Sequence, residues 1–566
     1  MNFLPLPGPD CDVVKKIIEL GFYDHLEIKE PHEYVDRCLD ILQSAPKCIS
    51  ELRRSDSAME QSKNNTIADN VRNEGNAFYH NRKWMNALIL FNNTICYGKP
   101  DSAQLAKGYA NRSALLFEMK YYKQCLEDID KALNIVSYTS DQRRKLIDRQ
   151  KEAKKLLPKQ ELKYFHKEIP ELSSVNPDIT AASLSVKIQK NDKYGRFIEA
   201  TRDIEGGEII AIERPYAIAI KEKKKKMYCS ECAEFSLNLI PCLKCSTVMY
   251  CDEICRDKAF KDYHEYECVV IRYYDDGFME HPLGWVALRS ALKGLKEYKN
   301  FDKPRSYQNV YRSNRYKEIF ELDSFNKGMS QTVIMELAFN IAKIFHVLKN
   351  KTDLIQKYKI TEKDLKFLLL KEKLTNALNS LPIQVYTPEA ECVGKSVGAG
   401  VYAFGSLFNH SCVENVDIFS YGAVQVYKAV KKIRKGEQCF INYGMPYQMM
   451  KKSDRQEKLK IRYQFTCDCR ACANNWPMMG EGKLTGKLQM TDLSTSDPML
   501  AVKLVRLLLL VEGKNKITDK NREDVLKEVF EVLDMLRFQE PTNIHLVLYD
   551  ILSVAMRYGN VLYEDY

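Results

Sequence analysis

The sequence predicts an α+β protein of several domains, and three observations lead to this class. The chain has 566 residues, whereas a single hydrophobic core rarely grows past roughly 250–300 residues. Helical periodicity marks both ends of the chain, and β-type alternation of apolar residues appears over residues 183–220. Cysteines gather in two tight clusters instead of being evenly spread. We therefore expect a β core with metal-binding segments, flanked by helical domains.

The bulk composition is that of an ordinary globular protein, with 45% apolar and 29% charged residues. The net charge of +10 is spread along the chain, and no groove-reading helix or concentrated basic face indicates nucleic-acid binding. Residues 1–30 lack an apolar segment behind a basic start. The most apolar run, residues 504–511, is too short to span a bilayer. We expect a soluble intracellular protein, cytoplasmic and/or nuclear, without a membrane partner.

Residues 1–65 predict an N-terminal helical segment that docks on the next part of the chain and ends in a polar linker. Residues 66–160 contain an internal repeat with a spacing of 38 residues. The repeated positions are Gly75/Ser113, Trp84/Tyr122, Ala87/Cys125, Phe91/Ile129 and Ile95/Leu133. Small residues recur where two helices approach closely, and large ones recur where they interlock. The pattern predicts helix–turn–helix repeats, either with a concave surface for a peptide partner or as a brace for the neighbouring domain.

The β-rich segment comes next and ends in a basic run. Its alternation is broken by turns, one of them at Gly195-Arg196-Phe197. Residues 221–226 read KEKKKK. This run fits a nuclear localisation patch or a solvated connecting loop, and we favour the loop.

A compact metal-binding module is predicted over residues 229–268. Seven cysteines and one histidine form four pairs at short spacing, namely Cys229/Cys232, Cys242/Cys245, Cys251/Cys255 and His264/Cys268. Two tetrahedral zinc ions need eight such ligands, and closed four-ligand sites are structural. A segment this short builds little apolar core, so metal binding would supply its folding energy. The seven scattered cysteines are interpreted as small buried side chains: Cys11, Cys38, Cys48, Cys96, Cys125, Cys392 and Cys439.

Two further segments predict helices. Residues 269–380 are mostly helical by pattern, for example over residues 333–348. The last segment, residues 486–566, is apolar and helical over residues 500–511, 525–536 and 544–556.

Three motifs in a fixed order carry the chemistry. Residues 398–412 read GAGVYAFGSLFNHSC, with a small-residue approach to an Asn-His pair. Residues 439–444 read CFINYG, a short apolar strand that ends in a Tyr-Gly corner. Residues 463–472 read YQFTCDCRAC, where a tyrosine and a phenylalanine precede three cysteines. Each motif alone is common; their ordered occurrence is specific.

This combination resembles the SET methyltransferase core followed by its cysteine-rich post-SET segment. With the cluster at residues 229–268, the chain resembles the SET and MYND domain (SMYD) family, and in particular its subgroup with N-terminal tetratricopeptide repeats. The resemblance covers residues 183–475. It implies a SET-type β core interrupted by a MYND zinc module and a helical insert, flanked by helical repeat domains.

The implied domain boundaries follow from these segments. They are 1–65 N-terminal helices, 66–160 tetratricopeptide-like repeats, 183–228 first part of SET, 229–268 MYND, 269–380 helical insert, 381–452 SET catalytic part, 453–475 post-SET and 486–566 C-terminal helices. In SMYD proteins the C-terminal helices form one wall of the substrate cleft. Here the segment is short, so we expect a more open cleft.

The resemblance also implies the site residues. Tyr443 and Tyr463 match the tyrosines of the lysine channel. The cofactor S-adenosylmethionine would contact Gly195, Arg196, Asn379, Asn409, His410, Tyr443 and Phe465. Phe197 stands where the family usually has a second glycine. The MYND resemblance pairs Cys229, Cys232, Cys251 and Cys255 on one zinc and Cys242, Cys245, His264 and Cys268 on another. Cys412, Cys467, Cys469 and Cys472 would hold a third zinc ion.

Two functions are therefore weighed. The first is a protein-lysine N-methyltransferase that uses S-adenosylmethionine on histone or non-histone proteins. The alternative is a transcriptional co-repressor or scaffold with weak or no methyl transfer. In the alternative, MYND binds proline-rich peptides and the repeats bind a peptide or a chaperone. The intact Tyr443, Tyr463, Asn409 and His410 favour the enzyme.

Overall fold

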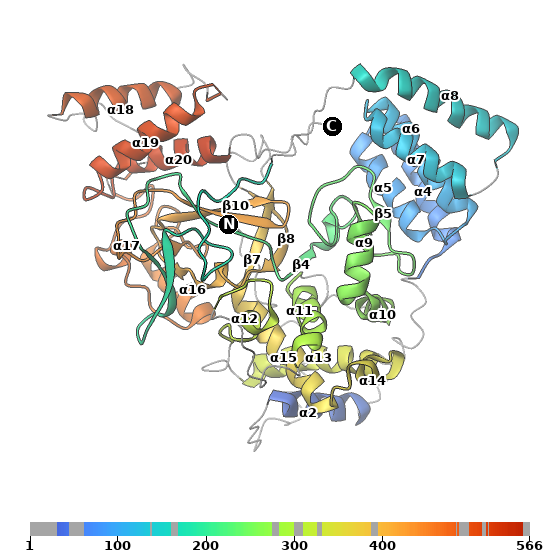
Figure 1. Cartoon of the computed structure of the whole chain (residues 1–566), viewed down its shortest axis with the longest axis horizontal. Coiled ribbons are helices and arrows are strands. Elements are labelled where there is room, and N and C mark those ends of the chain that lie inside the picture. The colour runs from blue at the N-terminus through green and yellow to red at the C-terminus, as the bar shows by residue number, and fades with distance from the viewer. Residues whose placement is uncertain are drawn as a thin grey trace.

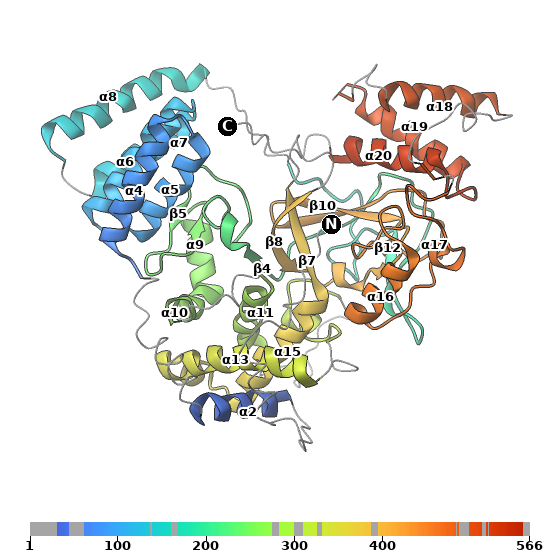
Figure 2. The same ribbon diagram turned by 180° about the vertical axis from the view of Figure 1, so that it is seen from behind.

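The computed structural model of the chain describes residues 31–44, 62–135, 138–159, 168–273, 282–298, 310–324, 331–385, 394–482, 484–485, 497–511, 517–518 and 520–557. The predictions for Cys11, Cys48, Cys392 and most of residues 1–65 fall outside these residues. Helices and strands are mixed in the described part, as expected for an α+β protein (Figures 1 and 2). The domain boundaries themselves stay predictions.

Four antiparallel helices and a longer one form a stack at one end of the molecule (Figure 1). They are α4 (Asn65–His80), α5 (Trp84–Tyr97), α6 (Ala103–Glu118), α7 (Tyr122–Ile135) and α8 (Ser140–Leu156). The residue at the first repeat position is small for a steric reason: a Cβ atom on Gly75 would lie 2.8 Å from the Phe91 ring. The hairpins predicted from the repeat are therefore present.

The helical stack is fastened to the cysteine-rich module by a buried arginine. Arg112 is fully buried and makes a two-pronged ion pair with Asp128, with N–O distances of 2.6 and 2.7 Å. Its Nη1 also donates to Asn92 Oδ1 at 2.6 Å and to the Leu239 carbonyl at 2.8 Å. Leu239 lies in the module, so these contacts support the predicted role of the stack as a brace.

The basic run takes part in the same interface. Lys226 Nζ donates to the carbonyls of Ser246 and Thr247, both at 2.9 Å. Lys225 is 4% exposed and lies over the Trp285 ring. The predicted solvated loop is wrong for Lys225, because aliphatic and aromatic contacts can bury the stem of a lysine.

The cysteine-rich module contains two short strands and a helical segment. They are β5 (Ile240–Pro241), β6 (Met249–Tyr250), α9 (Glu253–Ala259), η3 (Phe260–His264) and α10 (Glu265–Tyr273). The following segment is helical, as predicted: α11 (Pro282–Tyr298), α12 (Tyr316–Phe320), α13 (Gln331–Lys351), α14 (Leu354–Tyr358) and α15 (Glu362–Asn379). Helix α2 (Pro31–Ser44) packs on α13 and α15. It therefore docks on helices of the insert, far along the chain, and not on the adjacent repeats.

Several small sheets form the centre of the molecule. One has the order β10 (Val416–Tyr421), β11 (Val424–Ala429), β3 (Ile209–Glu213), and another has the order β4 (Ala217–Ile220), β8 (Lys395–Val401), β7 (Ser380–Val385). Two pairs complete them: β1 (Val186–Asn191) with β2 (Gly195–Ala200), and β9 (Asn409–His410) with β12 (Phe440–Ile441). The small residues before the Asn-His pair allow close strands, because a Cβ on Gly398 would lie 2.4 Å from the Ala219 carbonyl oxygen.

Helices α16 (Lys452–Tyr463) and α17 (Arg470–Ala473) follow the sheets, and α18 (Pro498–Val511), α19 (Arg522–Met535) and α20 (Asn543–Arg557) end the described chain. The last three pack over the β10–β11–β3 sheet through one apolar core (Figure 2). Phe530 of α19 fits against a glycine turn, where a Cβ on Gly206 would lie 2.2 Å from its ring. In the described part of the chain, no helix is both long and apolar enough to cross a bilayer.

Candidate active site and zinc centres

The eight residues predicted for the cofactor and lysine sites all line one cavity of about 1070 Å³. They are Gly195, Arg196, Asn379, Asn409, His410, Tyr443, Tyr463 and Phe465. The cavity also reaches α19 and α20, where Asp534, Arg537 and Tyr549 are part of its wall. The C-terminal helices therefore form one side of it.

The short parallel pairing of β9 with β12 brings the motifs together. Asn409 lies opposite Phe440, and His410 opposite Ile441. Consequently the Asn-His pair lies next to the strand that ends at Tyr443. The Asn409 side chain donates to Gln438 Oε1 at 2.9 Å, which holds the amide at the cavity edge.

His410 links the tyrosine corner to the third cysteine cluster. Its Nδ1 accepts a hydrogen bond from the backbone N–H of Tyr443 at 3.0 Å, and its Nε2 lies 3.4 Å from Cys412 Sγ. Burial lowers the pKa of His410 to about 4, so the ring is neutral at pH 7. Since Nδ1 accepts, the single proton lies on Nε2 and faces the sulfur atom.

Tyr443 and Tyr463 form an aromatic pair with ring centroids 4.7 Å apart. The Tyr443 hydroxyl donates to the Phe408 carbonyl at 2.7 Å. Burial raises the pKa of Tyr443, and the nearby Tyr463 and Asp323 raise it further. Burial also raises the pKa of Tyr463. Both hydroxyls therefore stay protonated at neutral pH.

Tyr463 and Phe465 are positioned by the end of α16. Gln464 adopts the left-handed conformation (φ 58°) that ends the helix and turns the chain. Gln456 then makes two hydrogen bonds with the backbone of Cys467, at 2.6 and 2.9 Å. The Phe465 ring lies 6.2 Å from His410, at the cavity wall.

The sequence did not identify two acidic residues of the cavity, Glu321 and Asp323. Arg196 donates to the Glu321 carbonyl at 2.7 Å, and Asn379 donates to the Asp323 carbonyl at 2.8 Å. Two predicted cofactor residues thus hold this segment in place. Glu321 and Asp323 lie in the helical insert, where no motif surrounds them, so no local signal could have found them.

The departure at Phe197 leaves the cavity open. Its side chain is 8% exposed, packs edge-on against Tyr194, and is not part of the cavity wall. Gly195, with φ +64°, has open space where a Cβ atom would point. The backbone at this turn is therefore accessible from the cavity.

The twelve predicted zinc ligands come together in three groups of four, with the interleaved pairing that the MYND resemblance implies. A Zn–S bond of about 2.3 Å places tetrahedral sulfur atoms about 3.8 Å apart. The observed separations are 3.7 Å for Cys232–Cys251, 4.0 Å for Cys242–Cys268 and 3.6 Å for Cys412–Cys472. All three groups therefore fit zinc, and the cysteines in the described residues are free of disulfides.

The four scattered cysteines that the structure describes lie outside these groups. They are Cys38, Cys96, Cys125 and Cys439, and all four are buried. Their prediction as small core side chains is confirmed.

Comparison with known proteins agrees with this geometry. The SET domain family model matches residues 195–444. The protein-lysine N-methyltransferase SMYD4 of Mus musculus is 24% identical over 74% of this chain and 68% of its own length. A SET and MYND domain-containing protein of Dictyostelium discoideum is 28% identical over 49% of this chain and 58% of its own. The N-lysine methyltransferase SMYD2-A of Xenopus laevis is 24% identical over 60% of this chain and 70% of its own. The chain belongs to the SET and MYND domain (SMYD) family of protein-lysine methyltransferases.

Proposed function

We propose that this protein methylates the ε-amine of a lysine in a protein substrate, with S-adenosylmethionine bound in the cavity. The observation that carries the proposal is the tyrosine pair Tyr443–Tyr463 beside the Asn409–His410 strand, in one cavity of about 1070 Å³. The cofactor, when bound, supplies an electrophilic methyl group. Everything else must come from the chain.

The polar groups of the cavity suit the cofactor. The carboxylates of Glu321 and Asp323 complement its positive charges, and Arg196 and Lys193 complement its carboxylate. Asn409 and Phe465 would hold the adenosine portion, as the family resemblance implies. The accessible backbone at Gly195 allows a close approach.

The tyrosine pair would prepare the lysine. A lysine ammonium, with a reference pKa of about 10.4, must lose a proton before it can react. The Tyr443 and Tyr463 rings exclude water, and desolvation lowers the pKa of an ammonium group. Because the Tyr443 hydroxyl donates to the Phe408 carbonyl, its oxygen lone pairs can accept from the amine and orient it. A protonated phenol cannot itself be the base, so the proton leaves to solvent.

The third zinc site would couple metal binding to the assembly of the active site. Its ligand Cys412 follows the Asn409–His410 strand, and Cys467, Cys469 and Cys472 follow Tyr463. One ion would thus hold the two halves of the aromatic channel together.

The test is methyl transfer from radiolabelled S-adenosylmethionine into proteins of a cell extract. Tyr443→Phe should lower the rate about 100-fold or more, with cofactor affinity, measured by calorimetry, changed less than about twofold. Tyr358→Phe, a tyrosine of α14 in the helical insert, is the matched control and should keep full activity. Absence of both labelling and cofactor binding in the wild type would contradict the proposal and support the scaffold alternative.

Residence in the cytoplasm and/or the nucleus, proline-rich partners of MYND, and peptide or chaperone partners of the helical stack remain proposals. The Arg112 contacts support a brace for at least one face of the stack. Localisation by microscopy of the tagged full chain and pull-down with the helical stack mutated would test them.

A further inference from the structure

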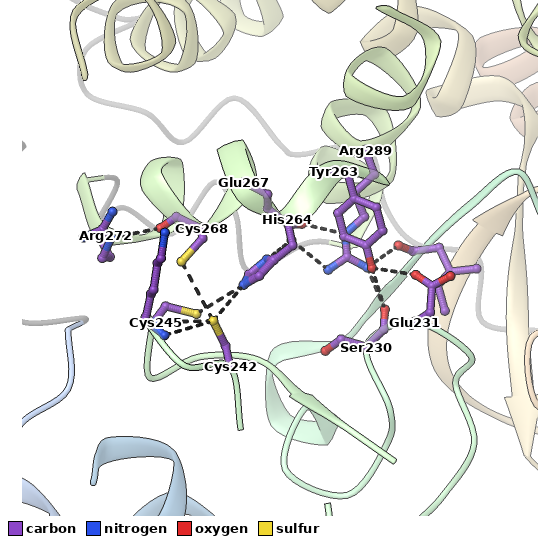
Figure 3. A network of polar contacts seen from close by, with 12 residues as sticks. Ser230, Glu231, Cys242, Cys245, Tyr263, His264, Glu267, Cys268, Arg272 and Arg289 are labelled. Atoms are coloured by element: carbon purple, nitrogen blue, oxygen red, sulfur yellow. Dashed lines mark hydrogen bonds and ion pairs between the residues drawn. The ribbon is translucent and has the colours of Figure 1, made fainter. Parts of the chain in front are cut away.

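A buried polar network lies between the second MYND cluster and the SET sheet (Figure 3). Its members His264, Glu267 and Arg289 are 1%, 0% and 3% exposed. The Glu267 carboxylate contacts both neighbours: Oε2 lies 2.7 Å from His264 Nδ1, and Oε1 lies 2.5 Å from Arg289 Nε. A second contact, Arg289 Nη2 to Oε2 at 3.2 Å, makes the ion pair two-pronged.

On one side the network meets the metal ligands. His264 Nε2 lies 3.2 Å from Cys242 Sγ and 3.7 Å from Cys245 Sγ, so it faces the point that a zinc ion would occupy. Its Nδ1–H then donates to Glu267. A carboxylate in this position orients the imidazole and strengthens it as a ligand.

On the other side the network meets the SET sheet. Arg289 Nη1 donates to the Ile218 carbonyl at 2.7 Å and to the Ser230 carbonyl at 2.8 Å. Ile218 lies in β4, the edge strand of the β4–β8–β7 sheet, and Ser230 follows the zinc ligand Cys229. The Tyr263 ring covers the guanidinium at 4.4 Å. One side chain therefore joins both zinc sites to the sheet.

Strand β4 is paired with the segment that leads into the cavity. Ile218 lies opposite Gly400 of β8, and the chain continues from β8 to the cavity residues Ser406 and Asn409. A shift of β4 would therefore reach the cavity wall through a single strand pairing.

We propose that Glu267 and Arg289 are positioning residues that couple the zinc site of Cys242, Cys245, His264 and Cys268 to strand β4. Loss of this zinc frees His264, which removes one of the two charged or polar partners of the buried Glu267 carboxylate. A buried carboxylate that loses a partner is unstable, so the Arg289 contacts rearrange and β4 loosens. The coupling does not depend on methyl transfer.

The first test uses the zinc-loaded full chain and its Glu267→Gln variant, which keeps the size but removes the charge. Metal analysis after chelator challenge should show one of three zinc ions released at about 10–100-fold lower chelator concentration than in the wild type. Hydrogen exchange should accelerate in peptides that contain residues 217–220 and 395–401. Glu265→Gln, which changes an exposed partner of Lys357 on the same helix, is the matched control and should change neither result.

The second test needs no variant, so a folding defect cannot obscure it. Wild-type protein is titrated with chelator, and cysteine alkylation identified by mass spectrometry reports which site has lost its metal. Exchange of residues 217–220 should rise in step with alkylation of Cys242, Cys245 and Cys268. Unchanged exchange after those cysteines have reacted, or full zinc retention in Glu267→Gln, would overturn the coupling.

Discussion

His410 accepts a hydrogen bond from the backbone N–H of Tyr443 at 3.0 Å while its other ring nitrogen lies 3.4 Å from Cys412 Sγ. A single imidazole thus connects the tyrosine corner with the post-SET zinc ligands. The His410 side chain is 6% exposed and is engaged at both nitrogens. Its contribution to the cavity is therefore to hold Tyr443 and the Cys412 segment in place.

Replacing His410 by alanine should loosen both ends of this connection. We expect cofactor affinity to fall about tenfold or more, and one zinc ion to be lost more readily, because side chains that contact metal ligands commonly contribute this much. Calorimetry and metal analysis measure the two effects. His80→Ala, an exposed histidine of α4, should leave both unchanged. Normal cofactor affinity in His410→Ala would contradict the assignment.

Removing one ligand of the third zinc site should abolish cofactor binding while most of the fold remains. In Cys469→Ala the segment with Tyr463 and Phe465 is no longer attached to the core. We expect two zinc ions per chain by metal analysis and no calorimetric binding of S-adenosylmethionine. Cys439→Ala removes a buried cysteine that lies outside the three clusters and should retain three zinc ions. Cofactor binding by Cys469→Ala would disprove the coupling.

Breaking the Arg112–Asp128 pair should detach the helical stack from MYND. Both side chains are 0% exposed, so Arg112→Met leaves a buried unpaired carboxylate and should cost about 3–5 kcal/mol of unfolding free energy. Limited proteolysis should cut between the stack and the module. The double variant Arg112→Met, Asp128→Leu should be more stable than the single one, because no charge is left unpaired. Equal loss in both variants would instead indicate that packing dominates.

Glu372 in the helical insert should make stability depend on pH. Burial raises the pKa of Glu372 to about 7, although the Tyr316 hydroxyl donates to the carboxylate at 2.8 Å. The folded state therefore holds a proton that the unfolded state loses above its ordinary pKa of 4.5. The unfolding free energy should fall as the pH rises from 4.5 to 7, by about 2–3 kcal/mol between pH 5 and pH 8.

Glu372→Gln removes this dependence, since an amide of the same shape can accept from Asn376 and donate to Tyr316. Urea unfolding of the variant and the wild type at pH 5 and pH 8 measures the difference, which should favour the variant at pH 8. Glu362→Gln, at the exposed start of the same helix, should show no such change. A difference that is independent of pH would contradict a raised pKa.

The sequence alone determined the local chemistry of this protein. Ligand spacing identified twelve zinc ligands, and the order of the three motifs identified the residues of the cavity, because each motif lies within a few adjacent residues. The repeat of small and large residues likewise predicted the helical hairpins. These are properties of short segments, where spacing directly limits geometry.

Only the tertiary structure decided which distant segments meet. Glu321 and Asp323 enter the cavity from an insert without a motif, Arg112 binds the Leu239 carbonyl, and Arg289 joins the Ile218 strand to Glu267. Lys225 is buried although it belongs to a basic run. The physical reason is that these contacts join backbone carbonyls and side chains far apart in the chain. No local pattern encodes such a pairing; it arises when the modules pack and every buried polar group must find a partner.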